Sequence, residues 1–260
     1  MTKPFACLSL SLCLSATLPT LAHANPEADS DGFTHPLSQL QFNPFMDQQA
    51  FERAGFEVLD VYDPWTGPNR RIYQFNQRAD EWIIMPVVRG YRYVTPDLAQ
   101  QGISNFFSNV GDIGNLLNSA FQLKGQRSME ITARLLINTT LGAFGLWDPA
   151  SKMGAPKHHE DFGQTLGHYG VGAGPYVVLP FLGPSNLRDA GGTVVDFASE
   201  QGVDFLNVAT ASSANPAISV LRAVDLRSGL PFEYGQTNSP FEYEKVRFLY
   251  NAARKIQIAD

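Results

Sequence analysis

The stretch from Leu141 to Gly192 constrains the fold most, because glycine and proline recur in it every few residues. Neither residue continues a long helix, since glycine loses much backbone entropy there and proline lacks the amide donor. The stretch nevertheless carries many large apolar side chains: Leu146, Trp147, Tyr176, Val177, Val178, Leu179 and Phe181. We therefore predict that it packs inside the body of the protein as turns and short segments.

Helices are predicted on both sides of this stretch, so the fold class is mainly α. After the turn at Asp63-Pro64-Trp65, apolar residues recur at spacings of three and four, which is typical of one helical face. These residues are Ile72, Phe75, Ala79, Trp82 and Ile83. Pro86 should end or kink this helix. Thr95-Pro96-Asp97 predicts the next helix start, with the Thr95 hydroxyl as its cap.

Further apolar stripes predict the remaining helices. The stripes or segments are Ile103 to Phe107, Leu116 to Phe121, a helix from near Ser128 through Leu136, Thr193 to Leu206, Ala217 to Leu226, and Pro240 to Ile256. No internal repeat or domain boundary is visible in the sequence, which favours one body over residues 61–260.

Residues 1–24 are predicted to be a signal peptide. Lys3 supplies the positive end, Phe5 to Leu18 form a short apolar stretch, and Ala22-His23-Ala24 offers a cleavage site. The apolar stretch is shorter than the roughly 20 residues that span a bilayer. Cys7 and Cys13 both lie inside this segment, and attachment of a lipid at Cys13 is an alternative to simple cleavage. Residues 25–60 should form a flexible lead-in that ends in a short helix near Gln48 to Leu59.

The composition limits the possible partners. Charged residues make up 17% of the chain, against a usual share of about 25%, whereas aromatic residues reach 12%. Such a chain has much apolar surface to hide, either in an ordinary aromatic core or against lipid. The net charge of −6 without a basic cluster argues against nucleic acid. Beyond the signal peptide no segment has 18 consecutive apolar residues, so membrane contact would require amphipathic or bent helices.

Three groups of residues could form a metal, hydrolytic or nucleotide site, and a structural role explains each of them better. His158-His159-Glu160-Asp161 holds potential metal ligands, but adjacent histidines in a loop point apart, so no metal is predicted. Ser185 lies outside any G-x-S-x-G motif, although His168 with Asp161 or Asp189 could be drawn as a triad. The glycines near residue 170 lack the spacing of a dinucleotide site. We therefore predict no cofactor and no enzyme, with Arg188-Asp189 as a local ion pair.

Several strings, in order along residues 60 to 255, resemble the VacJ (MlaA) family of outer-membrane phospholipid-retrieval lipoproteins. The longest begins with Asp161-Phe162-Gly163-Gln164-Thr165-Leu166-Gly167 and continues to Leu187-Arg188-Asp189. The others are Asp63-Pro64-Trp65, Phe75-Asn76, Arg89-Gly90-Tyr91-Arg92, Ser104-Asn105-Phe106, Ile137 to Gly142, and Asp148-Pro149-Ala150.

The resemblance implies a single ring-like helical body in or at the outer membrane, on its periplasmic side, that encloses an amphipathic channel. It also implies a function, namely removing mislocalised phospholipids from the outer leaflet and so maintaining lipid asymmetry. The implied partners are phospholipid, a trimeric porin and a periplasmic lipid-carrier protein. Because ATP is spent elsewhere in such a system, no nucleotide site is expected.

The resemblance also suggests site residues. Phe75 and Asn76 match a family position that controls channel opening; the alternative is that Phe75 belongs to the core and Asn76 to the helix surface. The turn with Gly170, Gly172, Gly174 and Pro175, and the segment from Ala223 to Pro231, are further channel candidates with structural roles as the alternative. Family members usually carry a lipid-attachment cysteine, whereas this sequence shows an ordinary cleavage site. A periplasmic lipid-binding or porin-docking protein without translocation therefore remains a second hypothesis, and a lipid hydrolase using Ser185 or His168 a third.

Overall fold

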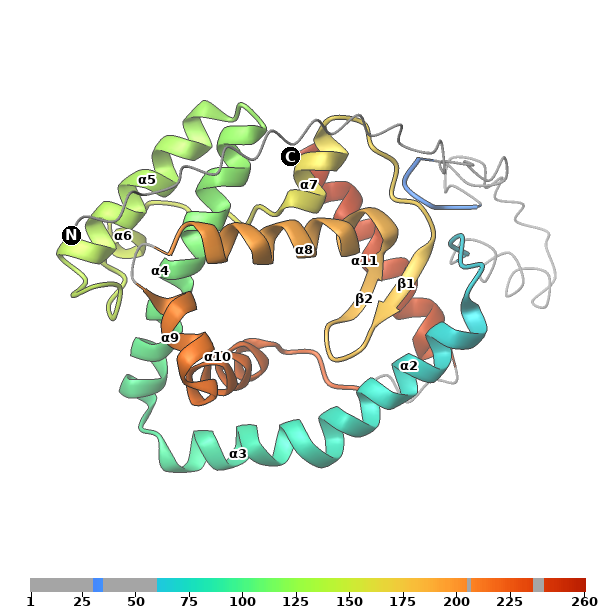
Figure 1. The fold of residues 1–260 in the computed structure, drawn as a ribbon, viewed down its shortest axis with the longest axis horizontal. Helices are drawn as coiled ribbons and strands as arrows, with labels where there is room; N and C mark the ends of the chain where they lie inside the picture. The colour runs from blue at the N-terminus through green and yellow to red at the C-terminus, as the bar shows by residue number, and fades with distance from the viewer. Residues whose placement is uncertain (1–29, 35–59, 205–206, 236–240) are drawn as a thin grey trace, which may run out of the picture.

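The structure is a computed structural model, and it describes residues 30–34, 60–204, 207–235 and 241–260. The predicted signal peptide and the predicted helix near residues 48–59 lie outside these ranges. The described part is mostly helical, as predicted. In Figure 1, α2, η2, α3 and α4 follow the outer edge of the molecule, and α8, α10 and a β-hairpin lie inside this edge.

The first long helical element is continuous but changes its winding. α2 (Thr66–Ala79) leads into the π-helix η2 (Asp80–Ile84), and α3 (Met85–Val94) follows without a break. Pro86 lacks an amide and its ring would clash with the carbonyl four residues earlier in a regular helix, so the wider π turns just before it fit its presence. The predicted helix is confirmed, but it does not end at Pro86; its winding changes to π in the residues just before the proline.

The next two helices pack side by side. α4 (Asp97–Phe121) unites the two stripes that were predicted separately, and α5 (Gly125–Thr140) returns along it. The expected cap at Thr95 is wrong, because Pro96 itself occupies the cap position and no side chain caps the helix. Instead, the amides of Ala99 and Gln100 bond the Pro96 carbonyl at 2.9 and 3.0 Å. The short α6 (Pro149–Lys152) follows.

The glycine- and proline-rich stretch forms turns and short elements, as predicted, and two of these are strands that were not predicted. Its predicted packing inside the body holds for Tyr176 and Val178, which are buried, but is wrong for Leu146, Trp147 and Phe181, whose side chains are exposed. α7 (Phe162–His168) precedes β1 (Tyr176–Leu179) and β2 (Gly183–Asn186). The strands pair antiparallel, with Tyr176 opposite Asn186 and Leu179 opposite Gly183. Phe181 in the turn between them has a φ of +64°, a left-handed conformation that costs energy for a residue other than glycine.

The C-terminal half is helical again, with α8 (Leu187–Gly202), α9 (Val208–Ala214), α10 (Pro216–Gly229) and α11 (Glu242–Ala259). α8 starts before the predicted Thr193, because the Asn186 side chain caps it by accepting the amide of Asp189 at 2.8 Å. The short α9 was not predicted. The main hydrophobic cluster joins α2, the hairpin and α11 and is rich in aromatic side chains: Phe33, Val61, Tyr73, Tyr176, Val178 and Tyr243.

A buried ionic cluster joins α11 to the beginnings of α7 and α8. The Arg254 guanidinium donates to both oxygens of Asp161 at 2.6 and 2.8 Å and to Asp189 at 2.7 Å. Asp189 also accepts from Arg188 at 2.9 Å and from the Tyr250 hydroxyl at 2.8 Å. The predicted Arg188–Asp189 pair is therefore confirmed, but it is buried within this cluster instead of lying on the surface.

Replacing Arg254 with Met should destabilise the protein strongly, because the partly buried Asp161 would lose its cation and the buried Asp189 would keep only Arg188. Removing one partner of a buried ion pair typically costs about 3 to 5 kcal/mol, which denaturant unfolding would measure. Lys255→Ala is the control, because this neighbouring side chain is half-exposed and its pair with Asp31 belongs to a class worth about 0 to 1 kcal/mol. Equal losses of unfolding free energy in the two variants would contradict a central role of the ionic cluster in stability.

The pH dependence of stability should reveal Asp161. Burial alone would raise the pKa of this carboxyl, but the hydrogen bonds and charge of Arg254 outweigh burial and hold the pKa at about 2. Because the unfolded value is about 3.9, ionised Asp161 stabilises the fold fully above that pH and progressively less as the pH falls toward 2. The free energy of unfolding should fall less steeply between pH 4 and 2 in Asp161→Asn than in the wild type. If the free energy of unfolding depended on pH in the same way in both proteins, Asp161 would contribute nothing to the pH dependence of stability.

Candidate functional site

A cavity of about 390 Å³ lies between α2, η2, the turn of the hairpin and α11. Its volume falls in the range of about 300 to 1,000 Å³ that is usual for ligand sites. Apolar and aromatic side chains make up most of the wall: Tyr73, Ile84, Phe181, Leu182, Pro184, Leu230, Phe232, Tyr234, Val246, Leu249 and Tyr250. Such a wall suits an apolar chain better than a polar metabolite.

Asp80 and Arg227 supply the charge in this wall. The Arg227 Nε and Nη2 atoms donate to the two Asp80 oxygens at 2.7 and 2.8 Å, a bidentate pair. Only 4% of Asp80 is exposed. The hydrogen bond to Asp80 raises the pKa of Arg227, so the guanidinium stays charged. The pair connects the π-helix to the end of α10, so one wall of the cavity is closed by an ion pair.

Asn76 lies one turn before Asp80 on the same helical element, and it holds the turn of the hairpin. Its amide nitrogen donates to the Leu179 carbonyl at 2.9 Å, and its oxygen accepts the Phe181 amide at 2.8 Å. Only 4% of Asn76 is exposed, whereas 47% of Phe75 is exposed. The Phe75 ring contacts the Phe181 ring edge-on, with centroids 5.2 Å apart. The alternative that placed Phe75 in the core and Asn76 on the helix surface therefore does not hold. Both predicted residues touch the hairpin turn that borders the cavity.

The glycine-rich turn lies elsewhere. Gly170, Gly172, Gly174 and Pro175 are not among the residues that line the described cavities. Ala173 within this turn donates its amide to the carbonyl of Ser30 at 2.9 Å. The turn thus attaches the N-terminal residues to the start of the hairpin, and a channel role for it stays a prediction. From the segment Ala223 to Pro231, Arg227 and Leu230 do line the cavity.

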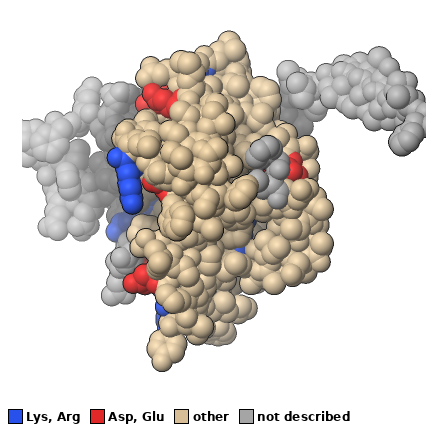
Figure 2. Space-filling model, turned by 90° about the vertical axis from the view of Figure 1, so that its left-hand side faces the viewer, with Lys and Arg blue, Asp and Glu red and all other residues tan. Residues whose placement is uncertain are grey.

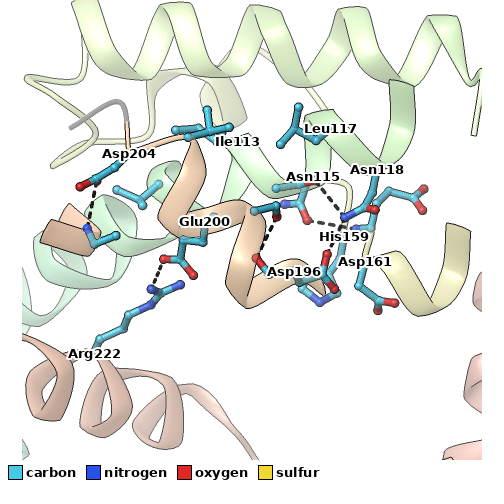
Figure 3. A pocket seen from close by; sticks show the side chains of 17 residues that line it. Ile113, Asn115, Leu117, Asn118, His159, Asp161, Asp196, Glu200, Asp204 and Arg222 are labelled. Atoms are coloured by element: carbon cyan, nitrogen blue, oxygen red, sulfur yellow. Dashed lines mark hydrogen bonds and ion pairs between the residues drawn. The ribbon is translucent and has the colours of Figure 1, made fainter. Parts of the chain in front are cut away.

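A second, smaller pocket of about 240 Å³ lies between α4 and α8 (Figure 3). An ion pair between Glu200 and Arg222 joins α8 to α10 at one end of it. At the other end, Asp196 accepts from Asn118 at 2.9 Å. Burial raises the pKa of Asp196 despite the hydrogen bonds from Phe162 and Asn118. The polar groups of this pocket are therefore largely engaged with one another, and it shares no lining residue with the larger cavity.

The residues considered for catalysis or metal binding have other contacts. His158 pairs with Glu130 at 2.6 Å, and His159 is exposed. Within the described ranges, no group of three metal-ligating side chains gathers. The Ser185 hydroxyl donates to the Asn186 carbonyl at 3.3 Å, and His168 lies on the surface against Tyr169. Asp161 and Asp189, the possible acids of a triad, bind Arg254 instead.

The surface of the described residues exposes many large apolar side chains. Among them, Trp82 is 75% exposed, Tyr93 93% and Leu98 74%. Figure 2 shows that the side of the molecule bearing α4, α5 and α6 carries few charged side chains. None of the described helices combines the length and apolar character needed to cross a membrane.

The fold and site together define a class: a helical protein with an apolar cavity, one guanidinium in its wall, and extensive apolar surface. These features suit a protein that handles amphipathic molecules. The model of the MlaA lipoprotein family matches residues 61–257. The chain belongs to this family.

Individual relatives agree with this assignment. A protein of Escherichia coli named intermembrane phospholipid transport system lipoprotein MlaA is 42% identical over 148 residues, which cover 55% of this chain and 59% of that protein. An uncharacterised protein of Rickettsia felis is 36% identical over 202 residues, covering 77% of this chain and 79% of its own length. A solved structure described as the structural basis for maintenance of bacterial outer membrane lipid asymmetry matches with a TM-score of 0.64 and 34% identity. It covers 75% of this chain and 98% of the matched chain.

The sequence pointed to Asn76 but missed Asp80, one turn further along the same element, and its partner Arg227. Asp80 has the appearance of an ordinary helix residue, and Arg227 lies 147 positions later, so no local pattern connects them. The charge of Asp80 gave no signal either, because the polar Asn76 and Gln77 precede it by one turn on the same helix.

Replacing Asn76 with Ala should loosen the hairpin turn. The partly buried Phe181 amide and Leu179 carbonyl would lose their partner, at a cost of about 0.5 to 1.5 kcal/mol for each hydrogen bond. Hydrogen exchange should therefore accelerate at the Phe181 amide. Gln74→Ala, at an exposed position on the same helix, should leave this exchange rate unchanged. Unaltered exchange in the Asn76 variant would show that other contacts hold the turn.

Proposed function

We propose that this protein is the outer-membrane component of a phospholipid transport system. In this role it removes mislocalised phospholipids from the outer leaflet and passes them to a periplasmic carrier, which maintains the lipid asymmetry of the outer membrane. Membership of the MlaA lipoprotein family supports the proposal. So do the name of the Escherichia coli relative and the description of the matched structure.

The observation that carries the proposal is the cavity of about 390 Å³ with an apolar wall and the Asp80–Arg227 pair. A phospholipid needs both kinds of surface, because its chains avoid water and its headgroup loses free energy in hydrocarbon. Trp82, Tyr93 and Leu98 on the outer edge supply surface that lipid would cover. A position on the periplasmic side of the outer membrane, a porin partner and a periplasmic carrier belong to this proposal. We further propose that the protein acts without catalysis.

Filling the cavity should block lipid binding. Leu249 is exposed and lines the cavity from α11, so Leu249→Trp would add a large ring there without disturbing the core. We expect mass spectrometry to find less phospholipid with the purified protein and phospholipid to accumulate in the outer leaflet of cells. Ile256→Trp, at another exposed position of α11 outside the cavity, is the matched control.

The outcomes separate the competing functions. Unchanged lipid content in Leu249→Trp would refute the cavity as the lipid site. A protein that binds phospholipid while its loss leaves outer-leaflet lipid unchanged would instead be a lipid-binding protein without translocation. Release of fatty acid by the purified protein, lost in Ser185→Ala, would support the hydrolase hypothesis.

A further inference from the structure

Arg227 is the only cationic side chain among the described residues that line the larger cavity. Two of its three nitrogens are directed at Asp80. The third, Nη1, has a single contact, with the Leu230 carbonyl at the long distance of 3.5 Å. This guanidinium therefore keeps donor capacity for another acceptor.

The geometry of the guanidinium group determines which acceptors Arg227 can bind best. Its parallel N–H groups fit the paired oxygens of a carboxylate, as Asp80 shows here, and fit those of a phosphate equally well. A phosphate that approached Arg227 would meet the Asp80 carboxylate bound to the same group. The two anions would compete, because like charges in a site of low polarity repel.

The rest of the wall determines what the phosphate is attached to. Phe181, Leu182, Leu230, Phe232 and Leu249 surround the charged pair with apolar surface. A free phosphate would leave that surface unfilled, whereas a neutral diacylglycerol would gain nothing from the guanidinium. A phosphate ester with acyl chains uses both parts of the cavity.

We propose that Arg227 binds the headgroup phosphate of the transported lipid and that Asp80 is a built-in competitor for the same guanidinium. The proposal rests on the function proposed above and adds the residue that recognises the headgroup. When the cavity is empty, Asp80 keeps Arg227 in position. When lipid fills the cavity, Asp80 lowers the affinity of Arg227 for the phosphate. Such competition favours release of the lipid, which a transport component needs as much as capture.

Two substitutions that break the same ion pair should therefore have opposite effects on binding. Arg227→Gln removes the phosphate partner and should weaken binding of dioctanoyl phosphatidic acid by about 10- to 100-fold, the usual value of a charge-assisted hydrogen bond. Asp80→Asn removes the competing charge and should tighten the same binding by several-fold. If the pair had a purely structural role, both variants would bind dioctanoyl phosphatidic acid more weakly than the wild type.

The titration uses the full mature chain in neutral detergent, with dioctanoyl phosphatidic acid, dioctanoylglycerol and inorganic phosphate as separate probes. Binding of dioctanoylglycerol should be the same in Arg227→Gln as in the wild type. Inorganic phosphate should bind far more weakly than phosphatidic acid; equal affinity would overturn the assignment to a lipid headgroup. Arg227→Lys keeps the charge but loses the fork, so it should give an intermediate affinity. It provides a test if Arg227→Gln does not fold.

Arg70→Gln is the matched control, because it breaks another arginine–carboxylate pair, with Glu244 between α2 and α11, outside the cavity. It should leave all three affinities unchanged. Suppose both lipids bind the wild type. If Arg227→Gln lowers the affinity for both lipids equally, or if Asp80→Asn also lowers the affinity for phosphatidic acid, the headgroup assignment fails but the proposed function survives. If neither lipid binds the wild-type protein, the proposed function itself fails.

Discussion

The contact of Arg254 with Asp161 and Asp189 determines where the other elements can lie. It brings the beginnings of α7 and α8 together against α11, and these helices pack without space for side chains at their crossing. A Cβ atom on Gly192 would lie 2.4 Å from the Gly163 amide nitrogen, so only glycine fits there. Because the hairpin is the connection between α7 and α8, this cluster fixes the base of the hairpin in the molecule.

The hairpin turn is then fixed from a second side by Asn76, and the two attachments make the cavity wall rigid. α2 provides Asn76, and the π-helix that continues it provides Asp80. One helical element thus holds both the hairpin turn and the end of α10. Asp80 lies one turn after Asn76 on this continuous element, and it pairs with Arg227 at the point where the winding changes to π. Hydrogen bonds and an ion pair thus position the polar side chains within a mostly apolar wall.

Local patterns in the sequence were sufficient for the long helices and insufficient for the site. The spacing of Ile72, Phe75 and Ala79 predicts α2 because helical periodicity is a local property. The hairpin was missed because Gly183 and Pro184 replace the alternating residues by which strands are recognised. Asn76 was singled out through the family resemblance, but its contacts lie more than 100 residues away and only the tertiary structure reveals them. Arg227 and Asp80 are 147 positions apart, so their pairing has no local signal either.

The π-helix also relates the outer surface to the cavity. Asp80 is buried at the cavity, whereas Trp82 and Ile83, in the same short segment, are exposed on the outside. Apolar side chains exposed to this degree are unfavourable in water, and acyl chains that covered them would remove that cost. Under the proposed function, lipid outside the molecule and lipid inside the cavity would therefore contact two sides of one helical segment. A change in the winding of that segment would alter both contacts together, because its residues share one backbone. Coupling of this kind needs no spanning helix, only a helix whose two faces meet different surroundings.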